Sequence, residues 1–111
     1  MINVVIWNEF VHEQEDEHVK SIYPNGIHGC IKDFLSEDKE LNIKTATLEE
    51  KDHGLTKELL DKTDVLIWWG HKAHNLVEDK IVDRVQQRIL EGMGLLVLHS
   101  GHHSKIFKRM M

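Results

Sequence analysis

The sequence predicts an α/β fold of the doubly wound kind, built on one parallel sheet. Short apolar runs alternate along the chain with segments whose apolar residues recur at helical spacing. Most of these runs are continuous, which is typical of strands buried on both faces. Strands that alternate with helices require right-handed crossovers, so the strands should be parallel. With 111 residues and no internal repeat, the chain is expected to form one domain.

Four strands are predicted. Residues 2–7 (INVVIW) and 64–69 (DVLIWW) are largely continuous apolar runs that lead into polar residues. Residues 42–48 (NIKTATL) alternate between apolar and polar side chains and are rich in β-branched types, which favour strands. Residues 94–98 form the fourth strand and end in the polar sequence HSGHHS.

Turn and cap residues predict the first two helices. The turn YPNG, at residues 23–26, precedes the first helix, and a second, short helix opens at Thr56. The apolar residues of the first helix recur at helical spacing and are Ile27, Ile31, Phe34 and Leu35.

Two more helices are predicted in the second half of the chain. Asn75, with Glu78 three residues later, forms a capping-box arrangement before the third helix, and Gly92 is expected to end that helix. A fourth helix begins within residues 102–111. The third helix carries a single apolar stripe made of Val77, Ile81, Val85 and Ile89.

Composition excludes several classes of partner. The chain carries 14 basic and 19 acidic residues, and its basic residues are scattered, which argues against nucleic acid and anionic membranes. No apolar run approaches the ~18 residues that cross a bilayer, and the N-terminus shows no export leader. The single cysteine, Cys30, cannot form an internal disulfide. We therefore expect a cytoplasmic protein in which Cys30 is a small buried residue.

Nine histidines are unusual for this length, and most of them follow predicted strands. The carboxyl ends of parallel strands meet at one edge of the sheet, where such folds bind ligands. We therefore expect a polar binding crevice there, whereas His18 and His53, which stand among charged residues, should lie on the surface. The residues expected to converge are Asn8, Glu9 and His12 from strand one, Gly70, His71 and His74 from strand three, His99, Ser100, His102 and His103 from strand four, and His28 from the first turn.

Two chemistries fit such a crevice. Three neutral imidazoles, or two with Glu9, can hold Zn²⁺ at ~2.0–2.2 Å and activate a bound water. Alternatively, His99 or His102 acts as a general acid or base, with Glu9 as its carboxylate partner. The strong zinc motif HExxH is absent, and each histidine taken alone is also explained as a hydrogen-bonding group. Both chemistries stay open at this point.

The tryptophans divide between the core and the expected crevice. Trp68 and Trp69 are consecutive on a strand, so their side chains point to opposite faces. We expect Trp7 and Trp68 to lie in the core. Trp69, next to Gly70, should form a wall of the binding site and stack on an apolar ring face of a ligand.

Four stretches of the chain closely resemble one known family: VIWNEFVHEQEDE, YPNGIHG, DVLIWWGHKAH and ILEGMGLLVLHSGHHSKIFKRM. They resemble the trehalose-utilisation (ThuA-like) family, and the match covers essentially the whole chain. The resemblance implies a flavodoxin-like sheet similar to that of class I glutamine amidotransferases. It also implies a role in carbohydrate metabolism, with a small-molecule sugar as the substrate: trehalose, a related disaccharide or an oxidised derivative.

The resemblance also explains the polar end of strand four. The amidotransferases carry a cysteine nucleophile in an elbow of the type Gly-x-Cys-x-Gly-His-Gln. On that pattern His99 stands in place of the cysteine, while Gly101, His102 and His103 fall on the glycine, histidine and glutamine. Ser100 comes one place late to be the nucleophile. No amidotransferase activity is therefore expected, because thioester chemistry needs the missing thiolate.

The length of the chain departs from the family. Amidotransferase-like domains run to roughly 200 residues. Residues 1–111 are therefore expected to be the N-terminal portion of a single ThuA-like domain, truncated after the fourth strand. That apolar strand would then be an edge strand, so we expect a homo-oligomer that forms through it.

Residues and resemblance together assign roles within the crevice. We predict His99, Glu9 and His102 to be catalytic, with His99 as the central residue. The alternatives are a non-catalytic sugar-sensing or interaction module and an inactive fragment of a longer protein. Substrate binding is assigned to Asn8, Trp69, Gly70, Ser100 and Gly101, and a site for Zn²⁺ or another divalent metal to His28, His71 and His99.

Overall fold

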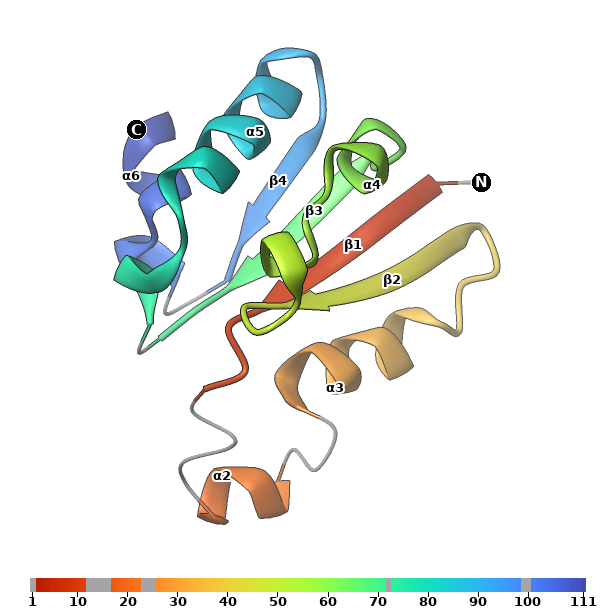
Figure 1. Cartoon of the computed structure of the whole chain (residues 1–111). Helices are drawn as coiled ribbons and strands as arrows, with labels where there is room; N and C mark the ends of the chain where they lie inside the picture. Colours follow the sequence, from red (N-terminus) through yellow and green to blue (C-terminus); the bar gives the residue numbers. More distant parts are fainter. Residues whose placement is uncertain (1, 12–16, 23–25, 72, 99–100) are drawn as a thin grey trace.

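The predicted doubly wound parallel sheet is confirmed. The computed structural model describes residues 2–11, 17–22, 26–71, 73–98 and 101–111. Its four parallel strands lie in the order β2-β1-β3-β4, the flavodoxin-like order (Figure 1). All four strands lie within two residues of their predicted bounds, and they are β1 (Ile2–Asn8), β2 (Leu41–Thr47), β3 (Val65–Trp69) and β4 (Gly94–Val97).

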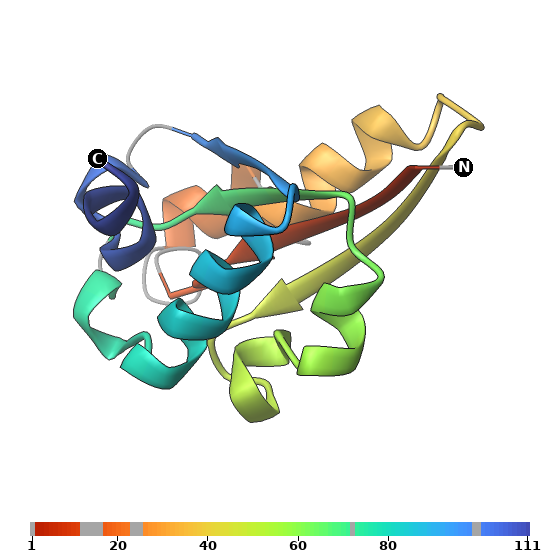
Figure 2. The same cartoon turned by 90° about the horizontal axis from the view of Figure 1, so that it is seen from above.

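Helices cover both faces of the sheet. Figure 2 shows α3 on one side and α4 and α5 on the other, while α2 lies away from the strands in Figure 1. Three short 3-10 segments join these elements: η1 (Lys51–Gly54), η2 (His74–Leu76) and η3 (Gly101–His103). The helices are α2 (Glu17–Ile22), α3 (Gly26–Leu35), α4 (Lys57–Asp61), α5 (Asp79–Leu90) and α6 (Lys105–Met110).

The larger core lies between the sheet and α4, α5 and α6. Trp7 and Trp68 stack within it, with ring centroids 4.0 Å apart and an interplanar angle of 19°, as their predicted core positions require. The stripe of α5 packs on this face, since Ile81 and Val85 are buried; Val77, predicted on the same stripe, is also buried but lies before the helix begins. Burying apolar side chains of this size contributes about 1.5–3 kcal/mol each, so this face dominates the stability of the fold.

The smaller core lies under α3. Ile31 and Leu35 pack on the buried face of β1 and β3, as the helical spacing predicts. Phe34, of the same predicted set, is 75% exposed and points away. The prediction that Cys30 is buried is wrong: it precedes Ile31 on the helix and therefore lies on the exposed side of α3.

Some of the predicted helix ends are confirmed and one is wrong. The hydroxyl of Thr56 accepts a hydrogen bond from the N–H of Leu59 at 3.2 Å, which confirms the predicted start of α4. Gly92 adopts φ +116° after α5, as a terminating glycine does. The predicted capping box is wrong, because Asn75 lies within η2 and α5 begins at Asp79.

The N–H of Glu78 is instead bound by a distant side chain, His53. The Nε2 atom of His53 accepts that hydrogen bond at 3.1 Å, so its Nδ1 atom carries the proton and donates to the carbonyl of Leu48 at 2.8 Å. The carbonyl of His53 accepts from the indole N–H of Trp7 at 3.1 Å. The prediction that His53 lies on the surface is therefore wrong: it is 8% exposed, because its ring joins η1 to the start of α5.

β4 forms an edge of the described sheet, as expected. It pairs with β3 alone among the described strands, and Leu96 on it is 54% exposed. A hollow beside the strand is lined by Leu95, Val97 and residues of α5 and α6. Self-association through β4 stays a prediction.

Replacing His53 should destabilise the protein. In His53→Ala the N–H of Glu78 and the carbonyl of Leu48 lose their partner, so we expect the free energy of unfolding to fall by about 1–3 kcal/mol. Urea unfolding followed by circular dichroism measures this loss. His18→Ala, on the exposed surface of α2, is the matched control. Equal stabilities of the two variants would contradict the structural role given to His53.

Candidate functional site

The candidate site lies where β1 and β3 end beside each other. β2 lies on one side of β1 and β3 on the other, so the chain changes direction across the sheet between them. The ends of β1 and β3 are therefore the point where the strand order reverses. Asn8 is in register with Trp69, and the N–H of Glu9 donates to the carbonyl of Trp69 at 3.4 Å. The pairing therefore brings Glu9 level with the loop that begins at Gly70.

Glu9 is a buried carboxylate with a defined partner. Its side chain has 0% exposure, and its Oε2 atom accepts a hydrogen bond from the N–H of Ala73 at 2.8 Å. A buried carboxylate is costly unless it is hydrogen-bonded, so this bond compensates for its removal from water. The bond ties the end of β1 to the loop that follows β3.

Gly70 leaves room beside it for the side chains of His74 and Glu9. A Cβ atom at this position would lie 3.2 Å from Nδ1 of His74 and 3.3 Å from Oε2 of Glu9. Both contacts are tighter than ordinary van der Waals distances, so a side chain here would displace the imidazole or the carboxylate. The glycine predicted to bind substrate thus sets the spacing of its polar neighbours.

His74 lies at the centre of a group of titratable side chains. Its ring centroid is 6.3 Å from that of His103, which follows β4. Burial lowers the pKa of His74, the charge of Glu9 raises it, and His103, His71 and Lys108 lower it further. The net direction is downward, so the neutral imidazole is favoured at neutral pH.

Asn8 organises the opposite side of the β1 end. Its Oδ1 atom accepts from the N–H of Phe10 at 3.0 Å, so its Nδ2 atom faces His28 and donates to Nδ1 of that ring at 3.0 Å. The proton of the neutral His28 ring therefore lies on Nε2. Phe10 contacts the same ring edge-on, with centroids 4.9 Å apart. His28 thus reaches the strand ends from α3, as predicted.

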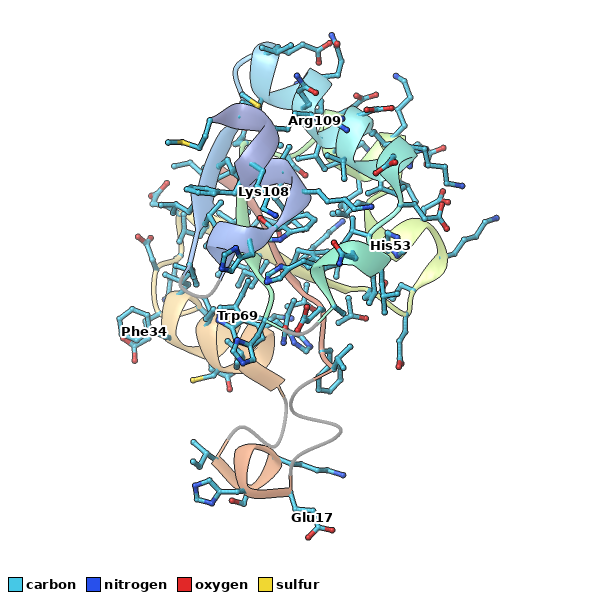
Figure 3. The ribbon with its side chains drawn as sticks, turned by 90° about the vertical axis from the view of Figure 1, so that its left-hand side faces the viewer. Glu17, Phe34, His53, Trp69, Lys108 and Arg109 are labelled. Atoms are coloured by element: carbon cyan, nitrogen blue, oxygen red, sulfur yellow. The ribbon has the colours of Figure 1, made fainter. Side chains whose placement is uncertain are left out.

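Trp69 and His71 continue the site on the α3 side of the sheet. Figure 3 shows Trp69 and His53 on opposite sides of the strands. The rings of Trp69 and His71 stack with centroids 6.1 Å apart, and Trp69 is 9% exposed while His71 is exposed. The predicted wall at Trp69 is therefore largely covered, and the exposed His71 stacks against it.

The residues predicted after β4, and His12 after β1, are described only in part. His12, His99 and Ser100 lie outside the described residues, as does the side chain of His102. Gly101 is buried, and a Cβ atom there would lie 2.6 Å from Cγ1 of Val97, which fits the tight turn expected after this strand.

Some contributors to the site have no signal in the sequence. The N–H of Ala73 is a backbone donor, which no residue type announces. Phe10 adopts φ +56°, and its N–H donates to Asn8, which helps to hold it beside His28. Lys108 is brought toward His74 by α6, whose start Ser104 caps by accepting from the N–H of Phe107.

A metal site formed by described residues alone is not found. Within the ranges that the structure describes, no group of three or more histidine, cysteine, aspartate or glutamate side chains is placed to hold a metal ion. The predicted set of His28, His71 and His99 includes a residue outside those ranges. The set therefore stays a prediction.

The lowered pKa of His74 should make stability depend on pH. The folded state binds this proton less tightly than the unfolded chain, so the stability contribution is present above the ordinary value of 6.5. It is lost as pH falls through the lowered pKa. Urea unfolding at about pH 7.5 and about pH 5 measures the loss, and His74→Gln should reduce it. His18→Gln is the control, and an unchanged loss in His74→Gln would contradict the prediction.

Comparison with known proteins identifies the family. No curated protein of known function matches the chain. None of the described helices is long and apolar enough to cross a membrane. A family model described as trehalose utilisation matches residues 3–111, which include every described strand and helix except the first residue of β1. The chain belongs to the trehalose utilisation (ThuA) family.

Proposed function

We propose that this protein binds or acts on a small sugar at the ends of β1 and β3. The sugar is trehalose, a related disaccharide or an oxidised derivative of one. The observation that carries the proposal is the meeting of Asn8, Glu9 and His74 at the reversal point of the sheet, in a chain of the trehalose utilisation family. Ligands of open parallel sheets bind at this point.

The groups at this edge suit a polyhydroxylated ligand. Sugar hydroxyls both donate and accept hydrogen bonds, and imidazole and amide groups can do both. The ring pair of Trp69 and His71 supplies an aromatic surface beside them, against which the apolar face of a sugar ring can pack. Asn8, Trp69, Gly70, Ser100 and Gly101 keep their proposed role in substrate binding.

The proposed chemistry is acid–base chemistry by histidine and carboxylate. His99 and His102 are the proposed proton-transfer groups, since imidazole titrates near neutral pH. Thiolate chemistry has no support: the only cysteine of the sequence, Cys30, lies exposed on α3 and does not follow a strand. The proposal therefore excludes an amidotransferase that depends on an elbow cysteine.

Turnover separates the enzyme from its alternative, a non-catalytic sugar-sensing module. We expect calorimetry to detect binding of trehalose or its keto-derivative, and chromatography of the same mixtures to detect turnover. In His99→Ala, binding should weaken about tenfold or more, because a polar partner of the sugar is lost. His18→Ala is the matched control.

Each result of this test has a definite meaning. Binding without turnover would favour the sensing module. A folded protein that binds no member of the panel would contradict the proposal and favour the inactive fragment.

A divalent metal is a separate part of the proposal. Zinc at His28, His71 and His99 would supply a Lewis acid and an activated water. If His28 held zinc through Nε2, its ring would carry the proton on Nδ1. The Nδ1 atom faces the Nδ2 donor of Asn8, so the hydrogen bond between these two side chains would be lost. We expect elemental analysis by mass spectrometry to find near-stoichiometric metal that is lost in His99→Ala. Metal-free protein would remove this part of the proposal and leave acid–base chemistry.

A further inference from the structure

We propose that His74 contacts the sugar and that Glu9 is the residue that positions His74. The proposal rests on the proposed function, since it assigns the contacts of the same site. It also gives Glu9, which was predicted to be the carboxylate partner of His99 or His102, a positioning role toward His74.

The burial of Glu9 supports a positioning role. The carboxylate has no exposed surface, and its Oε2 atom is already engaged by the N–H of Ala73 at 2.8 Å. A group that meets a sugar needs a path to solvent, and this side chain lies beneath the loop after β3. His74, by contrast, is partly exposed.

The hydrogen bond acts directly on the segment that carries His74. Ala73 is the residue before His74, and η2 begins at His74 itself. Fixing the N–H of Ala73 therefore fixes the start of this 3-10 turn. On the other side, the absence of a side chain at Gly70 leaves room for the imidazole, whose Nδ1 atom would lie 3.2 Å from a Cβ there.

The charges around His74 determine which protonation state of its ring would meet the sugar. Burial and the neighbouring His103, His71 and Lys108 lower the pKa of the ring, while Glu9 alone among these neighbours raises it. The neutral ring carries one acceptor nitrogen, which can receive a hydrogen bond from a sugar hydroxyl. Glu9 offsets part of the positive surroundings and so limits how far the pKa falls.

The coupling of the two residues can be measured at the histidine itself. We expect the titration midpoint of His74, followed by carbon–proton NMR of its ring and assigned with His74→Gln, to move to lower pH in Glu9→Gln. The charge that raises the pKa is then gone, while glutamine can still accept from Ala73. Glu17→Gln, an exposed carboxylate on α2, is the matched control and should leave the midpoint unchanged.

Binding of trehalose tests the contact. We expect affinity to fall about tenfold or more in His74→Gln, by a smaller factor in Glu9→Gln, and not at all in Glu17→Gln. If Glu9→Gln does not fold, Gly70→Ala replaces it, because a methyl group there displaces the His74 ring or the Glu9 carboxylate. In that variant the His74 resonances should shift and the affinity should fall.

Two results would overturn the inference. An unmoved His74 midpoint in folded Glu9→Gln would show that Glu9 does not act on this ring. Wild-type affinity in His74→Gln would show that His74 does not meet the sugar. Absence of sugar binding by the wild-type protein overturns the proposed function and the contact together, whereas the charge coupling of Glu9 to His74 is decided by the titration alone.

Discussion

The pairing of β1 with β3 at the centre of the sheet is the constraint on which the rest of the structure depends. Its register sets Trp7 beside Trp68 and Asn8 beside Trp69. One register thus stacks two indoles in the larger core and brings Glu9 to the loop that begins at Gly70. A shift by one residue would turn the side chains of a strand to the opposite face, so core and site would be lost together.

The sequence predicts those parts of the fold that depend on hydrophobic pattern and local chemistry. The strands, the stripe of α5 and the cap at Thr56 are such features. Features that depend on contacts between distant residues were missed. His53 stands among charged residues, yet its ring meets the N–H of Glu78, 25 positions away. This contact helps to bury His53, and it gives the N–H of Glu78 a partner other than the predicted capping residue Asn75.

The same distinction holds for the candidate site. Topology alone brings the ends of β1 and β3 together, so Asn8, Glu9 and Gly70 could be placed at one edge from the sequence. The sequence does not reveal which groups touch there. One partner of Glu9 is the backbone N–H of Ala73, and the orientation of His28 follows from the amide of Asn8, which the N–H of Phe10 orients.

The residues at this edge are poor choices for stability alone. A buried carboxylate must be compensated by hydrogen bonds, and an apolar side chain of similar volume often serves a core as well or better. Glycine has no methyl group to pack, and it loses more conformational entropy on folding than alanine would. A few residues away on the same strands, Trp7 and Trp68 are instead large apolar side chains that stack in the buried core. Departures from stability that cluster at one point of an otherwise consistent fold indicate selection for function there. On the resemblance to the amidotransferase elbow, His99 stands where those proteins carry a cysteine, so the function that we propose relies on imidazole, carboxylate and amide groups rather than on a thiolate.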